Sequence, residues 1–435
     1  MYHRIQSIFD KKGEEKVPND LLKIPVSFFA NNQRASLEFD VYSQTGALLF
    51  KKGTPFKDAA ITKCIVNKSN LFRKKPDPTS PPERVTTKIP ALLSEKQLHD
   101  LTQETAKVFS EIEKSGAINK STFNNSKRKF ESLLNFLQQK DLSYTSLYLS
   151  TEMSKLEDYV YQHAINTGIL AMVFGMKLGI PENQLINLIQ AAYYFDVGFN
   201  RVPIHIIRKK DTLTSRERQI IQAHPRLGYA LLHEFSKESP EDMGIINAKL
   251  TALLHHKKYN GSGYPYKKDF EALEFNFNIN YKAIPQFSKM TSICEMFTAL
   301  DADRPWRKKI QRAKILKKIL NETRLSFDIR LVHSFINKMG LMLNDHKPFF
   351  KVGDFFLVQS EFHRKHGVTV NHEIGICHGI NTDFLMSPQL LMVYNIEAKR
   401  KLNMIRIDLT KDPDRKIIKI IESQKKLDML KAKLA

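Results

Sequence analysis

The spacing of hydrophobic residues changes twice along this chain. Short apolar or alternating runs, broken by Gly and Pro, fill residues 1–75 and predict a small α+β or β domain. Residues 91–341 repeat apolar positions at helical spacing, which predicts a helical domain. Residues 345–435 return to short β-rich runs, which predict a β-barrel-like extension. We therefore expect a mainly α fold with a β-rich part at each end.

Several local signals refine these boundaries. Residues 76–90 hold five prolines among polar residues and predict an extended linker. Gly116 should end the first long helix, and Thr214 with Glu217 forms a capping-box pattern that should open another helix over residues 214–235. Residues 415–435 alternate apolar and basic positions and predict a closing helix with a solvated face.

The charge balance leaves two classes of partner open. The 435 residues include 68 Lys and Arg against 46 Asp and Glu, a formal charge of +22. This could indicate nucleic-acid binding. Because the basic residues are spread over the whole chain, a solvated surface is the better interpretation. A small phosphate-bearing ligand fits the same charge.

Nothing in the composition predicts export or a membrane span. The N-terminus lacks the apolar stretch and small-residue site of a secretory signal. The charge-free stretch 162–176 is too short to cross a bilayer. Three separated cysteines exclude a disulfide scaffold. We expect a cytoplasmic protein.

Potential metal ligands recur along the helical region. Imidazole and carboxylate together suit iron, manganese, zinc or nickel. The candidates are His163, Asp196, His224, His255, His256 and Glu295. An aspartate inside the apolar run around Asp196 is costly to bury unless it is paired or bound to a metal. Each histidine alone could instead be an ordinary hydrogen-bonded core residue.

A glycine-rich loop follows the paired histidines directly. The segment KKYNGSGYP, residues 257–265, offers free backbone amides and an aromatic ring beside the candidate site. An ordinary Asn-Gly turn would have the same composition.

These motifs together resemble the HD-GYP family, a branch of the HD-domain metal-dependent phosphohydrolases. The resemblance covers about residues 140–341 and is most specific in HHKKYNGSGYP and ADRPWR. It implies a helical bundle with two or three metal ions, commonly iron or manganese, that hydrolyses cyclic di-GMP to linear pGpG or GMP. Such ions clamp a phosphate and activate water.

The resemblance also implies individual roles. Asp196 would be the catalytic, bridging carboxylate, and the other five candidates would be terminal ligands. Gly263 and Tyr264 would border the ligand pocket. Arg304 and Arg307 would bind phosphate or guanine, for which a planar guanidinium is well suited.

The sequence departs from the family pattern mainly at the metal centre. Phe195 stands where the family has the His of its His-Asp pair, and Phe199 where it has a phosphate-binding Lys. The other departures are Tyr159 and Thr298 in place of carboxylates, Glu295 in place of Asp, Lys257 in place of Glu, and Asn260 in place of Asp. The rim of the pocket is therefore better preserved than its metal ligands.

Three functions follow from this pattern. The first is a weakly active or inactive receptor or scaffold that binds cyclic di-GMP or a related nucleotide and proteins such as diguanylate cyclases. The second is an active phosphodiesterase with a reduced metal site. Nucleic-acid binding is the third and rests on charge alone. We expect at most two metal ions, with an ion-free site as the alternative, and a homodimer is compatible with the sequence.

Overall fold

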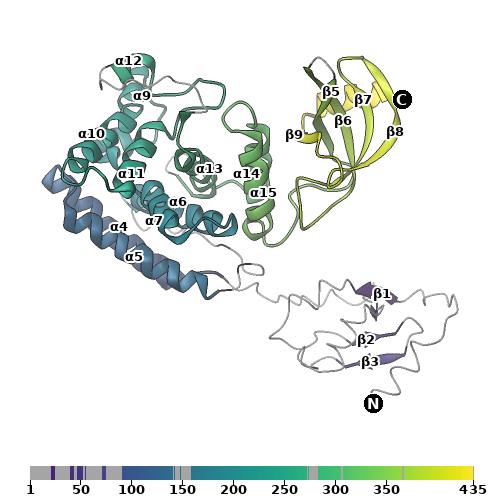
Figure 1. Cartoon of the computed structure of the whole chain (residues 1–435), viewed down its shortest axis with the longest axis horizontal. Helices are drawn as coiled ribbons and strands as arrows, with labels where there is room; N and C mark the ends of the chain where they lie inside the picture. The colour runs from purple at the N-terminus through teal and green to yellow at the C-terminus, as the bar shows by residue number, and fades with distance from the viewer. Residues whose placement is uncertain are drawn as a thin grey trace. The chain divides into compact units, whose positions relative to one another are not determined.

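The chain divides into two compact units in a computed structural model, residues 1–89 and residues 90–435 (Figure 1). The structure describes residues 21–24, 40–43, 47–51, 54, 71–74, 91–140, 142, 147, 158–271, 273, 283–304, 307–364 and 367–434. The predicted linker, residues 76–90, and most of the first domain lie outside these residues. The side chain of Tyr159 does too.

The first unit contains a four-stranded antiparallel sheet. Its strands are β1 (Leu21–Ile24), β2 (Val41–Tyr42), β3 (Leu48–Phe50) and β4 (Leu71–Lys74). They lie in the order β1-β4-β2-β3, so the first and last strands in sequence are neighbours. Val41, Phe50 and Phe72 are its buried apolar residues among those described. The predicted small β domain is confirmed.

The second unit begins with a helical region. Its longer helices are α4 (Glu95–Ser115), α5 (Lys120–Gln138), α6 (Asp158–Lys177), α7 (Glu182–Tyr194), α10 (His224–Ser236), α11 (Met243–Leu254), α13 (Gln286–Asp301), α14 (Arg312–Asn321) and α15 (Ile329–Leu343). Shorter ones are η1 (Val197–Arg201), α8 (Ile204–Ile207), α9 (Ser215–Ile221) and α12 (Lys267–Glu271). Figure 1 shows α4 and α5 side by side on one flank of the bundle. The prediction of a mainly helical fold is confirmed.

Local sequence explains where these helices begin and end. Ser94 and Gln97 form a capping box at the start of α4, and Gly116 ends it in the left-handed conformation at φ 69°. Thr214 and Glu217 form the predicted capping box of α9. The predicted single helix over residues 214–235 is wrong, because Pro225 lacks an N–H for the Ile221 carbonyl and the chain breaks into α9 and α10.

The core of the bundle is formed by helices that are buried on nearly all sides. In α7, every residue from Leu188 to Tyr194 is buried, and α6 is similarly enclosed. Aromatic side chains fill the space between α4, α5 and α7: Phe109 and Phe123 stack on Tyr194, and Tyr194 shares a 2.9 Å hydrogen bond with Ser126. Two of the metal-ligand candidates belong to this core, because His163 lies in the first turns of α6 and Asp196 follows the end of α7.

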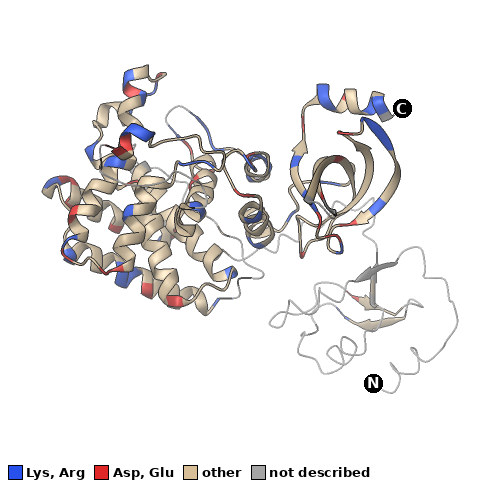
Figure 2. Ribbon diagram, turned by 45° about the horizontal axis from the view of Figure 1, so that its top comes forward, with Lys and Arg blue, Asp and Glu red and all other residues tan. Residues whose placement is uncertain are grey.

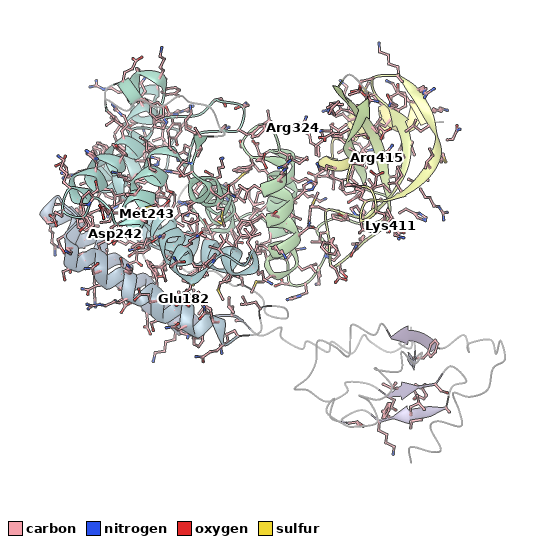
Figure 3. The ribbon with its side chains drawn as sticks, in the orientation of Figure 1. Glu182, Asp242, Met243, Arg324, Lys411 and Arg415 are labelled. Atoms are coloured by element: carbon pink, nitrogen blue, oxygen red, sulfur yellow. The ribbon has the colours of Figure 1, made fainter. Side chains whose placement is uncertain are left out.

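The chain ends in a five-stranded antiparallel sheet and a helix. The strands are β5 (Phe355–Arg364), β6 (Gly367–Gly379), β7 (Gln389–Asn395), β8 (Arg400–Asp408) and β9 (Arg415–Ile421), followed by α16 (Gln424–Leu434). Their order is β8-β7-β6-β5-β9, and Figure 2 shows the sheet strongly curved. Arg415 of β9, labelled in Figure 3, binds the buried Glu373 of β6 at 2.9 Å.

The predicted helix over residues 415–435 is wrong in its first third. Residues 415–421 form β9, which pairs with β5 from Phe355 to Ser360. The β-branched residues Ile417, Ile418 and Ile420 are buried there, and their packing outweighs the amphipathic helical pattern. Only residues 424–434 are helical.

The C-terminal sheet shares its core with the helical region. Buried residues of α15, such as Met339, belong to the same apolar cluster as Phe356 and Ile417 of the sheet. The sequence predicted three domains, and this continuous core joins the second and third. The exact boundaries at residues 91, 341 and 345 stay a prediction.

The described residues contain no helix that is both long and apolar enough to cross a bilayer. Figure 2 shows Lys and Arg on many elements of the second unit rather than gathered on one.

Candidate metal centre

Six predicted ligands converge from separate parts of the bundle. They are His163 of α6, Asp196 between α7 and η1, His224 at the start of α10, His255 and His256 just after α11, and Glu295 of α13. Asp196 precedes η1 without capping it, so its carboxylate is available to the centre. Four of the six, all except His256 and Glu295, are buried.

Asp196 is the hub of this cluster. Its Oδ1 atom lies 3.2 Å from Nε2 of His224 and 3.6 Å from Nε2 of His255. Its Oδ2 atom lies 3.9 Å from Nε2 of His163. The two Nε2 atoms of His224 and His255 are themselves 3.2 Å apart. One carboxylate therefore faces three imidazoles.

Backbone carbonyls fix which nitrogen of each ring faces the centre. Nδ1 of His224 lies 2.8 Å from the Ile221 carbonyl, which Pro225 leaves without its usual helical donor. Nδ1 of His255 lies 2.9 Å from the Thr251 carbonyl. In a neutral ring each Nδ1 must carry the proton to donate these bonds, so each Nε2 presents a lone pair.

Burial keeps the paired histidines neutral. It lowers the pKa of His255 to about 4, against the opposing effect of the Asp196 charge. Burial also lowers the pKa of His256 well below its ordinary value, and the charges of His255 and His224 add to this. Near neutral pH both rings are therefore in the form that binds metals.

The pKa of Asp196 is lowered in the same place. Burial raises the pKa of Asp196, but hydrogen bonding to a protonated His224 and the charges that His224, His255 and His163 carry when protonated outweigh it, so the net pKa is lowered. With neutral rings, Oδ1 receives no hydrogen bond from any residue that the structure describes.

His163 and Glu295 form a second side of the centre. Nε2 of His163 lies 3.8 Å from Oε1 of Glu295. Nδ1 of His163 lies 3.2 Å from the hydroxyl of Thr298, which in turn lies within 3.1 Å of the Cys294 and Glu295 carbonyls. Thr298, where the family has a carboxylate, therefore orients a ligand histidine.

Two phenylalanine rings pack against the histidines of the candidate centre. Phe195 is fully buried and meets His163 edge to face, with ring centroids 5.4 Å apart, and His255 at 5.0 Å. Phe199 stacks on His224, with centroids 4.2 Å apart and an interplanar angle of 14°. Apolar rings thus lie against the histidines at the two positions where the sequence departs from the family pattern.

The glycine-rich loop covers the other side of His256. The ring of Tyr264 lies 4.4 Å from that of His256, centroid to centroid. Gly263 has φ 86°, and a Cβ there would lie 2.1 Å from the His256 carbonyl oxygen, so only glycine fits. Nζ of Lys257 lies within 3.4 Å of the Gly261, Gly263 and Pro265 carbonyls. This lysine holds the loop closed from inside.

The donor set fits a divalent cation. His224, His255 and His256 offer ligand atoms that all lie within 4.8 Å of one another. Lone pairs on two imidazoles and one carboxylate oxygen face each other at 3.2–3.6 Å, an arrangement that a cation would neutralise. A divalent ion held there would act as a Lewis acid toward a phosphodiester.

Comparison with known proteins finds a family match for the helical region. Residues 148–331 match the family model described as HD domain. The chain contains an HD domain. The prediction of an HD domain is thereby confirmed, and its assignment to the HD-GYP branch stays a prediction.

Several curated relatives of this HD domain are cyclic di-GMP phosphodiesterases by name. PA4108 of Pseudomonas aeruginosa is 23% identical over 185 residues, which are 42% of this chain and 40% of that protein. RpfG, a response regulator of Xanthomonas campestris, is 28% identical over 160 residues, 37% of this chain and 38% of that protein. PdeB of Borreliella burgdorferi is 24% identical over 183 residues, with coverages of 42% and 44%. The chain thus matches about two fifths of the length of these relatives.

A solved structure matches part of the chain distantly. It is the crystal structure of the PgpH phosphodiesterase HD domain from L. monocytogenes. The match covers 43% of this chain and 92% of the PgpH chain, with 17% identity and a TM-score of 0.30.

The two predicted ligand-binding arginines have different surroundings. Arg307 donates to the Ala299 carbonyl at 2.7 Å and to the Leu300 carbonyl at 3.3 Å, so its guanidinium caps the end of α13. Burial lowers the pKa of Arg304 to about 9, with a further contribution from the charge of Arg307. Phosphate binding by either arginine stays a prediction, and the capping bonds weaken the case for Arg307.

Gly198 is a residue that the motif analysis missed. A Cβ at Gly198 would lie 2.0 Å from the His224 carbonyl oxygen and 2.5 Å from the Gly228 nitrogen. The backbone of η1 therefore touches the backbone of α10, which brings Asp196 next to His224. The available signal was a glycine two residues after the aspartate, inside a run of buried apolar residues.

Proposed function

We propose that this HD domain binds cyclic di-GMP, or a closely related cyclic dinucleotide, beside one or two divalent metal ions and hydrolyses it slowly or not at all. It would then act as a receptor or scaffold. The observation that carries this proposal is the pair of phenylalanine rings packed against His163, His255 and His224.

Both rings remove groups that phosphodiester hydrolysis would use. Phe195 takes the place of an imidazole ligand, and Phe199 the place of an ammonium group near the phosphate. Preorganised polar groups are the largest contribution to stabilising charge in a transition state. Neither ring can donate a hydrogen bond or carry charge, whereas binding of the nucleotide can still use the loop at Gly263 and Tyr264.

The metal itself is the part that the donor set supports best. Asp196, His224, His255 and His256 would hold the first ion, and His163 with Glu295 would contribute to a second. Mixed imidazole and carboxylate ligands suit iron or manganese. Asp196 would be the shared ligand of the two ions.

An active phosphodiesterase is the second candidate. It is favoured by the arrangement of Asp196, whose two oxygens lie within 3.2–3.9 Å of three imidazoles. Such a carboxylate could still bridge two ions and support turnover with a reduced ligand set.

Metal analysis and a turnover assay on the same purified protein distinguish the receptor from the active phosphodiesterase. After reconstitution with iron(II) or manganese(II), we expect bound metal, binding of cyclic di-GMP by calorimetry, and little pGpG or GMP. An Asp196→Asn variant should lose metal, whereas the exposed control Asp211→Asn should retain it. Rapid turnover by the unmodified protein would establish the phosphodiesterase instead, and absence of nucleotide binding would leave only a protein scaffold.

The nucleic-acid alternative has its own signature. Binding to many phosphates releases counterions and weakens steeply as salt rises. A cyclic dinucleotide carries two phosphates, so its binding should depend only weakly on salt. A cytoplasmic location, a homodimer and protein partners such as diguanylate cyclases remain part of the proposal.

A further inference from the structure

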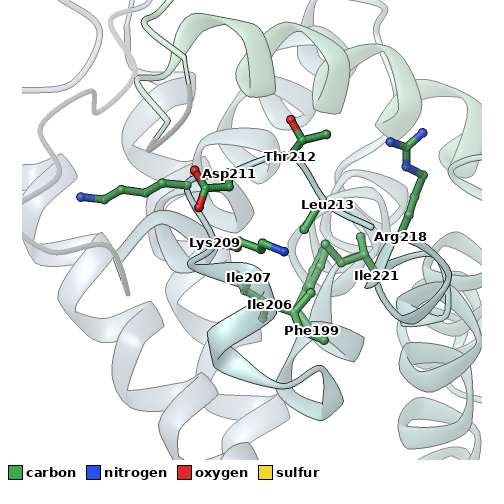
Figure 4. Close-up of a pocket in the computed structure, with 10 residues that line it drawn as sticks. Phe199, Ile206, Ile207, Lys209, Asp211, Thr212, Leu213, Arg218 and Ile221 are labelled. Atoms are coloured by element: carbon green, nitrogen blue, oxygen red, sulfur yellow. The ribbon is translucent and has the colours of Figure 1, made fainter. Parts of the chain in front are cut away.

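A cavity of about 590 Å³ lies beside the metal centre, outside the residues assigned to it. Figure 4 shows it between η1, α8 and the segment that leads into α9. Its volume is within the range of small-molecule sites, roughly 300–1,000 Å³. Its apolar lining consists of Phe199, Ile206, Ile207, Leu213 and Ile221.

Two residues of this lining also hold a ligand of the metal centre. Phe199 stacks on the ring of His224, and the Ile221 carbonyl accepts the hydrogen bond of His224 Nδ1. Phe199 therefore belongs to the lining of the cavity and also contacts His224. A molecule that reaches the metal centre could extend into it past Phe199.

The basic side chains that line the cavity differ in whether an acidic side chain already pairs with them. Lys209 is neutralised, because its Nζ lies 2.8 and 2.9 Å from the two carboxylate oxygens of Glu217. Lys210 and Arg218 are exposed lining residues, and Asp211 is the lining carboxylate. An apolar wall with two exposed cations suits a planar ring that carries one phosphate.

We propose that this cavity binds one base and its phosphate from the cyclic dinucleotide, the half that does not lie at the metal centre. The base would rest on the wall formed by Phe199, Ile207 and Leu213, and the phosphate would meet Arg218. This inference rests on the proposed function and adds where the second half of the ligand binds. It also gives Phe199 a role, since an apolar ring extends the wall where a lysine would interrupt it.

The test compares two charge reversals on α9. Arg218→Glu changes a lining residue, and Arg216→Glu changes an exposed arginine of the same helix that does not line the cavity. Calorimetry with cyclic di-GMP should show binding weakened about tenfold or more by Arg218→Glu and within about twofold for Arg216→Glu. Leu213→Trp, which fills the cavity without changing charge, should weaken binding to a similar degree.

Metal content and melting temperature are measured for every variant. Both should stay unchanged, because none of the substituted residues is a ligand or part of the core. Equal effects of Arg218→Glu and Arg216→Glu, or unchanged binding by Leu213→Trp, would overturn the inference while the proposed function stands. If the unmodified protein binds no cyclic di-GMP, the proposed function fails and the inference fails with it.

Discussion

At the scale of single residues, Phe195 and Phe199 carry the proposal that this centre hydrolyses cyclic di-GMP slowly or not at all. Each lies beside candidate ligands that keep their backbone partners. On this proposal, only the groups at positions 195 and 199 differ from those of a hydrolytic centre. Phe195 is fully buried between His163 and His255, where an imidazole of similar size could fit the same space. The substitution is therefore reversible in principle without rebuilding the bundle.

Phe195→His should increase the amount of bound iron or manganese per chain. The new imidazole adds a neutral ligand between His163 and His255, and each added ligand raises the affinity of the site. Elemental analysis after reconstitution measures the change. Combination with Phe199→Lys should also raise the rate of cyclic di-GMP hydrolysis. The control is Phe195→Leu, which keeps the position apolar and should add no metal; equal metal content in both variants would contradict the prediction.

Gly198→Ala should damage the centre without touching a ligand. Its Cβ would overlap the His224 carbonyl, so η1 and α10 must separate, and overpacking of this kind costs about 1–3 kcal/mol. We expect less bound metal and a lower free energy of unfolding in urea. Gly168→Ala is the matched control, because a Cβ there meets its neighbours at 3.8 Å or more. Equal stability of the two variants would show that η1 can shift freely.

The sequence predicted the residue types of the centre better than their roles. Motif order predicted six candidate ligands, and the fold brings all six side chains near one another, while their binding of metal stays a prediction. It could not predict that Thr298 orients His163 or that Arg307 caps α13, because hydrogen-bond partners depend on where α6 and α13 meet. Gly198 escaped notice since its importance lies in a backbone contact with α10.

At the scale of elements, the sequence predicted the helix caps correctly. It did not predict which secondary structure forms where one segment suits both a helix and a strand. Gly116 and the Thr214 capping box act locally, and both appear as predicted. Taken alone, the sequence of the segment from Arg415 to Ile421 predicts an amphipathic helix. It becomes β9 because β5 offers a ten-residue partner strand with an apolar face, which is information from 60 residues earlier.

The stability of the protein should depend on pH through His333, which lies where α15 contacts β9. Its Nε2 donates to the Ile417 carbonyl at 2.6 Å, and burial lowers its pKa to about 4 despite that bond. Nearby Lys416 lowers the pKa and Asp328 raises it. Because the unfolded chain binds the proton near pH 6.5 and the folded chain only near pH 4, stability should fall as pH drops between these values, by up to about 3 kcal/mol.

His333→Gln tests this junction. Glutamine keeps an N–H donor but does not titrate, so the variant should lose less stability than the unmodified protein between pH 6.5 and 4. His378→Gln, at an exposed position of β6, is the control and should keep the full dependence. Urea unfolding at several pH values provides the measurement. Parallel pH profiles for all three proteins would show that His333 carries none of the effect.

At the scale of the whole chain, the C-terminal sheet is joined to the bundle by polar bonds as well as by the shared core. The Met386 amide donates to Asn337 of α15 at 2.8 Å, and the Ile420 amide donates to Asn321 at 2.9 Å, at the end of α14. Lys317 of α14 pairs with Glu422 at 3.1 Å. These bonds involve two helices, α14 and α15. Separation of the sheet from the bundle would therefore leave the Met386 and Ile420 amides without these partners.

Limited proteolysis of the full chain should therefore cut first within residues 74–90 and spare the region around residue 344. Five prolines and polar residues predict an extended segment at the first site, and the division between the two units falls at residues 89 and 90. At the second site, cleavage would require the shared core around Met339 and Phe356 to open. Mass spectrometry should find an early fragment that begins between residues 74 and 90 and retains the C-terminal sheet. Early release of residues 345–435 as an intact piece would contradict the single core and favour an independent C-terminal module.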